Sequence, residues 1–216
     1  MQTIRNMGVI GAGAWGTALA KHLAEKGLTV RLWAYEADVA QAINTKHENP
    51  MFLPGVTLPR TLVATSSIAD AVEGCHGLLF VVPSHVTRPV LQTLAPYLSK
   101  PIPLISATKG IEEETAQLMT QVMDDVLPPP MRPMIMALSG PSFATELSAG
   151  KPTALCLAGR EPTLVQQFQQ TLMTPAFRLY ADTDLIGVQL GGALKNVMAL
   201  AAGVVDGLEL GLNARA

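Results

Sequence analysis

The sequence has few cysteines, few aromatic residues and few charged residues. Cys75 and Cys156 are its two cysteines, and neither stands in a metal-binding or redox spacing. They provide no disulfide framework, and we predict no metal site. Both lie in apolar, strand-like runs where a small buried side chain is expected, so the chain fits a reducing compartment, the cytoplasm.

Charge is sparse and forms no basic cluster. Charged residues make up 15% of the chain, the formal net charge is -2, and lysines and arginines form no run. Nucleic acid binding depends on a basic field, so we expect no nucleic-acid partner. The first apolar run carries Arg5 and leads into a glycine-rich turn, which is unlike a signal peptide.

Apolar residues are abundant, at 49%, and one run of them is long enough to cross a membrane. Residues 185–205 contain Gln189, Lys195 and Asn196 near their middle. A lysine at the centre of a bilayer costs about 2.5 to 3.5 kcal/mol. We therefore predict a buried helix here and no transmembrane segment.

Short apolar runs alternate along the chain with segments of helical periodicity. The alternation is typical of an α/β fold, and we predict a Rossmann-type, doubly wound, mostly parallel sheet with helices on both faces. The predicted strands are residues 4–10, 29–34, 77–82, 104–107, 134–138 and 153–158. The predicted helices are residues 14–26, 36–44, 85–98, 112–126 and 162–173, with Glu112, Glu113 and Glu114 in the first turn of the fourth.

The pattern changes after Asp182, where the predicted strands end and one long helix over residues 184–205 follows. We place a domain boundary there, between a first domain of residues 1–182 and the start of a helical domain in residues 183–216. The second segment is too short to fold as a unit, so we expect that domain to be incomplete.

The first predicted strand leads directly into Gly11, Gly13 and Gly16, and the residues after them favour a helix. In a strand-turn-helix unit, this spacing holds the pyrophosphate of a dinucleotide at the helix N-terminus. The first glycine permits the turn, the second the approach of the phosphates, and the third close helix packing. A glycine-rich turn without a ligand is the alternative. The strand, helix and second strand follow in the required order, which favours a cofactor site.

The second predicted strand ends near Tyr35 and Glu36. An acidic side chain about 20 residues after the turn accepts a hydrogen bond from the ribose 2′-OH of NAD, whereas an arginine holds the 2′-phosphate of NADP. No arginine stands here, which favours NAD. Glu36 could equally be a solvated acid at the start of a helix.

Lys195 is the one charged residue between positions 185 and 205. On a helix its face carries Gly191, Gly192, Ala199 and Ala202, so other groups can approach the ammonium closely. We expect a dry, crowded site, in which burial would make the lysine a proton donor and acceptor near neutral pH. The alternative is a lysine that reaches solvent from a core helix.

Polar residues follow two further predicted strands, at the positions where ligands bind in open parallel sheets. Lys109 offers a positive charge for a phosphate or oxygen of a substrate, and Gly140 and Ser142 offer hydrogen-bond donors at a helix start. Each could also be turn chemistry alone. We interpret His85 as an ordinary first-turn residue.

These stretches resemble the NAD(P)-dependent glycerol-3-phosphate dehydrogenases, and the resemblance covers the chain end to end. It rests on GVIGAGAWGTALA (8–20), INTKHENPMFLPGV (43–56), VVPSH (81–85), ATKGIEEET (107–115), SGPSFATEL (139–147) and GVQLGGALKNVMALAAG (187–203).

The resemblance implies an oxidoreductase that transfers a hydride between NAD(P)H and carbon 2 of dihydroxyacetone phosphate, giving sn-glycerol 3-phosphate for phospholipid synthesis. Lys195 would donate a proton to the developing alkoxide, and Lys109, Gly140 and Ser142 would contact the substrate. The residues expected around NAD or NADP are Gly11, Gly13, Ala14, Trp15, Gly16, Tyr35, Glu36, Lys109 and Ala144.

Two features depart from the family pattern. Family members often carry an arginine where this chain has Tyr35 and Glu36. The family also continues into a helical domain that supplies an acidic residue and an Arg-Asn pair for the substrate phosphate. We therefore expect a truncated enzyme that alone turns over dihydroxyacetone phosphate poorly or not at all. A related 3-hydroxy acid dehydrogenase and a non-catalytic dinucleotide-binding module are the alternatives, and a homodimer is an open option.

Overall fold

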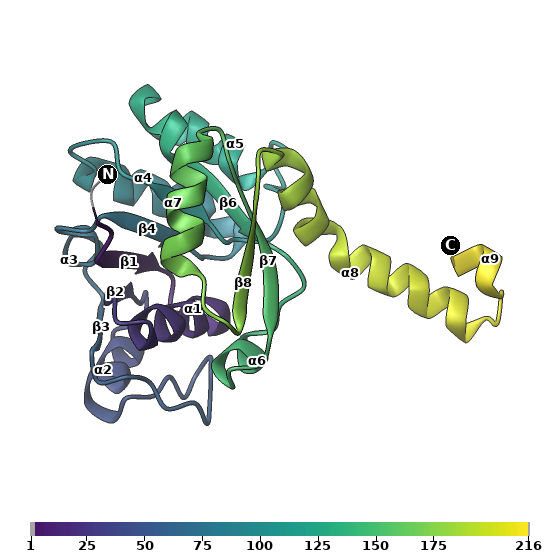
Figure 1. Ribbon diagram of the computed structural model, residues 1–216, viewed down its shortest axis with the longest axis horizontal. Coiled ribbons are helices and arrows are strands. Elements are labelled where there is room, and N and C mark those ends of the chain that lie inside the picture. Colours follow the sequence, from purple (N-terminus) through teal and green to yellow (C-terminus); the bar gives the residue numbers. More distant parts are fainter. Residues whose placement is uncertain (1–2, 216) are drawn as a thin grey trace.

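The computed structural model describes residues 3–215, and within them the strands form one eight-stranded sheet (Figure 1). Its order is β3-β2-β1-β4-β5-β6-β7-β8, and neighbours run parallel except β6 and β7, which run antiparallel. The predicted Rossmann-type, mostly parallel sheet is therefore confirmed. The strands are β1 (Asn6–Ile10), β2 (Thr29–Trp33), β3 (Leu62–Thr65), β4 (Gly77–Phe80), β5 (Leu104–Ser106), β6 (Ile135–Ser139), β7 (Thr153–Gly159) and β8 (Phe177–Asp182).

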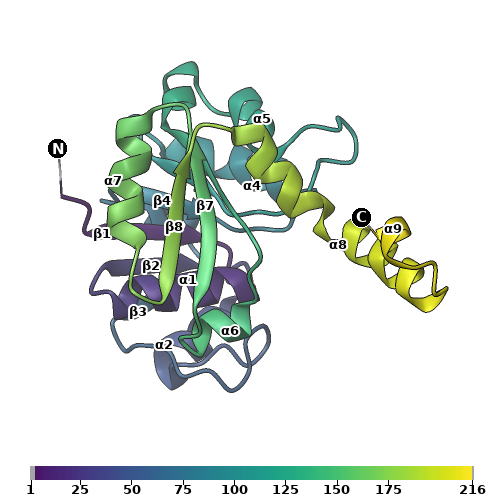
Figure 2. The same ribbon diagram turned by 45° about the vertical axis from the view of Figure 1, so that its right-hand side comes forward.

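Helices pack on both faces of this sheet, and one long helix extends away from it (Figures 1 and 2). The α-helices are α1 (Ala14–Glu25), α2 (Ala37–Lys46), α3 (Ile68–Val72), α4 (Thr87–Leu94), α5 (Met119–Val126), α6 (Ala144–Ser148), α7 (Pro162–Leu172), α8 (Leu185–Gly207) and α9 (Leu212–Arg215). Short 3-10 turns stand at η1 (Ser84–Val86), η2 (Ala95–Tyr97) and η3 (Pro129–Met134).

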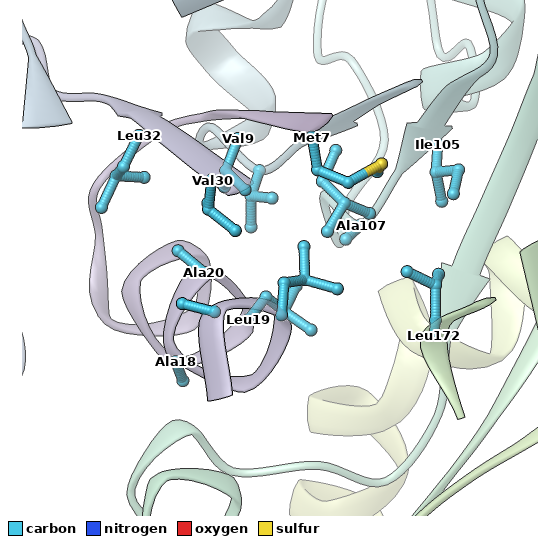
Figure 3. Close-up of a cluster of buried hydrophobic side chains, with 14 of the residues drawn as sticks. Met7, Val9, Ala18, Leu19, Ala20, Val30, Leu32, Ile105, Ala107 and Leu172 are labelled. Carbon is cyan, nitrogen blue, oxygen red and sulfur yellow. The ribbon is translucent and has the colours of Figure 1, made fainter. Parts of the chain in front are cut away.

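The core lies on the two faces of the central strands, which are apolar on both sides as parallel strands are. On one face, α1 places Leu19 and Ala20 beneath β1 and β2, as Figure 3 shows. On the other face, α3, α4 and α5 cover a second cluster of buried side chains. Burial of this apolar surface holds the ends of the central strands in fixed positions.

Among the described residues, two strands, β3 and β8, and three helices, α3, α6 and the four-residue α9, lie outside the sequence prediction. β3 and β8 are sheet edges, and along β8 exposed and buried residues alternate, so neither forms a long apolar run. The helices α3 and α6 have five residues each, which is too short for a clear helical period.

The helix predicted over residues 112–126 is wrong in its first half, because α5 begins only at Met119. Residues 112–118 form a loop closed by a bridge between Ile111 and Leu118, and Ala116 adopts a left-handed φ of 55°. Glu112, expected in the first turn of the helix, instead pairs with Arg88. That ion pair makes a loop stable where the three carboxylates had indicated a helix start.

The long helix predicted over residues 184–205 is confirmed as α8, but the prediction that it is buried is wrong. Along the described α8, the buried residues are Leu185, Gln189 and Gly192, and the rest of the helix extends away from the sheet (Figure 2). By length and composition α8 could cross a membrane, a test that the core helices of soluble proteins also pass. In α8, 11% of the most apolar 18-residue window is buried. Lys195 at its middle argues against such a span.

Candidate functional site

A cavity of about 840 Å³ opens where the chain leaves the carboxyl ends of the central strands. Because β1 has β2 on one side and β4 on the other, the segments that follow β1 and β4 diverge to opposite faces of the sheet. Such a crevice is where open α/β sheets bind ligands. Among the lining residues are Gly11, Gly13, Ala14, Trp15, Gly16, Tyr35, Glu36, Phe52, His85, Lys109, Ser142 and Ala144.

The three glycines of the turn differ in what surrounds them. Gly11 has a φ of 117°, and a Cβ there would stand 2.5 Å from the carbonyl oxygen of Val81. A Cβ on Gly16 would overlap the carbonyl oxygen of Gly11. A Cβ on Gly13 would meet nothing within 4 Å in the described chain. Gly11 and Gly16 thus allow close packing, whereas Gly13 leaves open space at the cavity.

Trp15 forms part of the cavity wall at the start of α1. Its indole Nε1 is buried and has no hydrogen-bond partner within residues 3–215. A buried indole N–H without a partner is costly, so this donor is suited to an acceptor that enters from the cavity. The ammonium of Lys109 stands 5.7 Å from the centre of the Trp15 ring, within the range of a cation-π contact.

Lys109 joins the loop after β5 to the loop after β6. Its Nζ donates hydrogen bonds to the Gly140 carbonyl oxygen and to Ser142 Oγ, both at 3.1 Å. The three residues predicted from separate strand ends are therefore in direct contact. Burial lowers the pKa of Lys109 from its usual value, and the nearby charge of Lys195 lowers that pKa further.

Lys195 reaches the same region from α8, but its surroundings differ from the prediction. Its Nζ lies 5.4 Å from the centre of the Phe143 ring, and the side chain is exposed. The expected dry, crowded site for Lys195 is wrong for this structure, because α8 extends away from the sheet just beyond Gly192. Phe143, which follows Ser142, connects this lysine to the Lys109 cluster.

Two contacts fix the first half of α8 against the sheet domain. Gln189 is buried, its Oε1 accepts a hydrogen bond from the backbone N–H of Thr120 at 3.0 Å, and its Nε2 donates to Thr120 Oγ1 at 2.9 Å. One turn further on, a Cβ on Gly192 would overlap Ser139 Oγ at the end of β6. These contacts place Lys195 beside Phe143 and near enough to Lys109 for its charge to act there, while Lys195 itself does not line the cavity.

At the opposite end of the cavity, Tyr35 and Glu36 follow β2. Tyr35 is 80% exposed and packs edge-on against Trp33, with ring centroids 6.3 Å apart. Glu36 is partly exposed, and as the residue before α2 it makes no side-chain capping hydrogen bond. Both side chains are therefore available to a ligand at this end.

Sequence reasoning missed three residues that shape the cavity. Phe52 forms part of its wall, Asn49 fixes the loop that carries Phe52, and Arg88 fixes the loop that carries Lys109. Asn49 and Arg88 act through partners that are distant in sequence, and no local pattern shows these partners. The motif over residues 43–56 contains Asn49 and Phe52, but it assigns neither of them a role. His85, predicted to be an ordinary first-turn residue, also lines the cavity.

Comparison with known proteins agrees with this geometry. Residues 6–165 match the NAD-dependent glycerol-3-phosphate dehydrogenase N-terminus, and residues 184–216 match the C-terminus of the same family. The chain belongs to the NAD-dependent glycerol-3-phosphate dehydrogenase family. The resemblance drawn from the sequence motifs is thus confirmed.

Individual members of this family show the same relationship. The chain is 49% identical over 210 residues to glycerol-3-phosphate dehydrogenase [NAD(P)+] of Geobacter sulfurreducens, which covers 97% of this chain and 63% of that protein. The crystal structure of the Coxiella burnetii glycerol-3-phosphate dehydrogenase superposes with a TM-score of 0.88 at 36% identity, covering 99% of this chain and 65% of the other. The chain therefore spans less than two thirds of the length of these relatives.

Proposed function

We propose that this chain binds NAD or NADP in the cavity at the glycine turn. Three observations support a fit to a dinucleotide: the open space beside Gly13, the unpartnered Nε1 of Trp15, and the close packing at Gly11 that brings the turn to the cavity floor. A helix N-terminus with an open backbone suits a pyrophosphate. Ala14 and Ala144 would complete the lining near the turn, and Tyr35 and Glu36 the far end.

We further propose that the protein is an oxidoreductase interconverting dihydroxyacetone phosphate and sn-glycerol 3-phosphate, a precursor of phospholipids. The observation that carries this proposal is the convergence of Lys109, Gly140 and Ser142, with Lys195 beside them, at one rim of the cavity. When bound, the reduced cofactor supplies a hydride. Lys195 donates a proton to the oxygen on carbon 2 as negative charge develops there, and accepts it in the reverse reaction.

In this mechanism the other residues bind and orient. Lys109 offers its ammonium to an oxygen or phosphate of the substrate while it stays bonded to Ser142, and Gly140 contributes backbone beside it. We assign residues 1–182 to a dinucleotide-binding domain and residues 183–216 to the start of a helical substrate domain. Cys75 and Cys156 are free thiols, which supports a reducing, cytoplasmic location.

Titration of NADH into the chain, followed by calorimetry, tests the binding proposal. We expect saturable binding that Gly13→Val weakens, because the new side chain fills the open space without a local clash. The melting temperature of the variant serves as the control for folding. Absence of saturable binding by the wild-type chain would refute the proposal.

Oxidation of NADH that depends on dihydroxyacetone phosphate tests the reaction, in the full-length protein. Lys195→Ala should lower kcat by about a hundredfold or more, as loss of a positioned acid does, with little change in NADH affinity. Unchanged kcat would remove Lys195 from the chemistry. A panel of carbonyl substrates with and without phosphate separates this reaction from that of a 3-hydroxy acid dehydrogenase.

The exposure of Lys195 favours one other candidate, a dinucleotide-binding module without catalysis. In that case NADH affinity would be the same with and without dihydroxyacetone phosphate, and the full-length protein would show no turnover. Substrate-dependent turnover would exclude it.

A further inference from the structure

Asn49 is a fully buried polar residue in the loop that follows α2. Its Nδ2 donates hydrogen bonds to the Ala12 carbonyl oxygen at 2.8 Å and to Thr17 Oγ1 at 2.9 Å. Its Oδ1 accepts a hydrogen bond from the backbone N–H of Phe52 at 3.1 Å. Both amide protons and the amide oxygen are thus used, which accounts for the presence of this polar side chain in the core.

The first effect of Asn49 is on the glycine turn. The Ala12 carbonyl oxygen accepts from Asn49 and also from Thr17 Oγ1, at 3.1 Å. No cis peptide occurs in residues 3–215, so the N–H of Gly13 points opposite to the Ala12 carbonyl and away from Asn49. Within the described chain this N–H donates to no other group. Asn49 therefore holds the orientation of a free backbone donor in the glycine turn, at a residue that lines the cavity.

The second effect is on the cavity wall. Asn49 Oδ1 holds the backbone of Phe52, whose ring lines the cavity. The loop is closed on itself by backbone bonds from Leu53 to Asn49 at 2.9 Å and from Leu58 to His47 at 2.8 Å. Leu53 and Leu58 are buried, so the loop forms one packed unit with the turn. A single amide thus connects the floor of the cavity to its wall.

We propose that Asn49 is a positioning residue for the cofactor turn, coupling the order of residues 47–58 to occupancy of the cavity. The inference rests on the proposed dinucleotide binding and adds to it a residue that does not touch the ligand. Because coupling between two sites is reciprocal, cofactor binding stabilises the loop to the same extent that the ordered loop favours binding.

Asn44 provides a matched control, because it makes a similar pair of bonds away from the cavity. Its Nδ2 donates to the Ala64 carbonyl oxygen and its Oδ1 accepts from the Ala64 N–H, both at 2.8 Å. These bonds join α2 to β3 and do not reach the glycine turn. Replacement of either asparagine by aspartate turns a donor into an acceptor that faces a carbonyl oxygen. Both variants therefore lose a donor to a backbone carbonyl oxygen, Asn49→Asp in the core beside the glycine turn and Asn44→Asp at an exposed position away from it.

The experiment measures NADH affinity, thermal unfolding, and hydrogen exchange of residues 47–58 with and without NADH. For Asn49→Asp and the uncharged Asn49→Leu we expect affinity to fall about tenfold, as loss of a buried hydrogen bond predicts. We also expect loss of the exchange protection that NADH gives residues 47–58 in the wild type. Asn44→Asp should lower the melting temperature and leave both cofactor readouts unchanged.

Thr17→Val provides a second variant if the Asn49 variants fail to fold. It removes one partner of the Asn49 amide and the bond from Thr17 Oγ1 to the Ala12 carbonyl oxygen, and it keeps the bond from Asn49 Nδ2 to Ala12. It should weaken NADH binding in the same direction. Unchanged affinity and loop protection in folded Asn49 or Thr17 variants would overturn the inference alone. Absence of NADH binding by the wild type would refute the proposed function and this inference with it.

Discussion

Arg88 donates two parallel hydrogen bonds to Glu112, from Nε to Oε1 at 2.9 Å and from a terminal nitrogen to Oε2 at 2.7 Å. Thr115 Oγ1 donates to Oε2 as well, at 2.5 Å. Glu112 stands three residues after Lys109, so this ion pair holds the loop that carries Lys109 against α4. The geometry is the bidentate one that makes arginine-carboxylate pairs strong.

We predict that this pair makes stability depend on acid pH. Hydrogen bonds from Arg88 and then from Thr115 lower the pKa of Glu112 below its usual 4.5. A carboxylate with a lowered folded pKa stabilises the protein above its unfolded pKa, and this contribution is lost as the pH falls through the folded value. Glu112→Gln should cost about 1 to 2 kcal/mol at pH 7 and reduce the loss of stability below pH 4.5, in urea unfolding. Glu113→Gln, at the exposed neighbour, is the control and should change neither.

We predict that removal of the charge of Lys195 raises the pKa of Lys109. Burial lowers the pKa of Lys109, and Lys195 lowers it further, so Lys195→Met should raise that pKa while Lys195→Arg should leave it low. A lysine with a lowered folded pKa binds fewer protons when folded, so its contribution to stability improves as the pH rises from the folded pKa toward 10.5. The pH dependence of Lys109 acetylation, read by mass spectrometry, measures the shift. Identical profiles for the three proteins would contradict the prediction.

We predict that α8 tolerates a larger side chain at Gly191 and is destabilised by one at Gly192. A Cβ on Gly192 would overlap Ser139 Oγ, whereas one on Gly191 would meet nothing within 4 Å in the described chain. Gly192→Val should therefore lower the free energy of unfolding by about 1 to 3 kcal/mol relative to Gly191→Val, the usual cost of overpacking. The two variants make the same change in helix propensity, so equal unfolding energies would show that α8 does not pack closely at Ser139.

We predict that Glu36 favours NADH over NADPH. Its carboxylate lines the cavity and makes no capping hydrogen bond, so it is free to accept from a ribose 2′-OH and to repel a 2′-phosphate. In Glu36→Gln, the ratio of the NADPH dissociation constant to the NADH dissociation constant, measured by fluorescence titration, should fall toward one. Asp38→Asn removes a carboxylate in the first turn of α2 and should leave the ratio unchanged. Equal affinities in the wild type would contradict the prediction.

Much of the fold could be predicted because its central strands are buried on both faces. β1, β4 and β5 are apolar except for Asn6 at the start of β1 and Ser106 at the end of β5, and the glycine turn marks the start of α1. β8 gives no such signal, since Arg178 and Tyr180 are exposed on an edge strand. The loop at residues 112–118 was predicted to be helical because its glutamates suit a helix start, and the partner of Glu112 lies 24 residues earlier.

The candidate site could be predicted only where strand ends bring residues together. Lys109, Gly140 and Ser142 follow neighbouring parallel strands, so their contact follows from topology. The exposure of Lys195 depends on where α8 leaves the sheet, which its small residues do not determine. Asn49 bonds to partners 37 and 32 residues earlier, and nothing in its local sequence shows them.

The hydrogen bond from Asn49 to the Ala12 carbonyl oxygen affects how the strand, glycine turn and helix could be transferred to another protein. The strand, glycine turn and helix from β1 to β2 form the usual modular fragment, yet one determinant of its backbone orientation lies beyond α2. A chimaera that exchanges only residues 6–33 would leave the turn without its second donor. Exchange through residue 58 would carry the turn, Asn49 and the closing bond at Leu58 together.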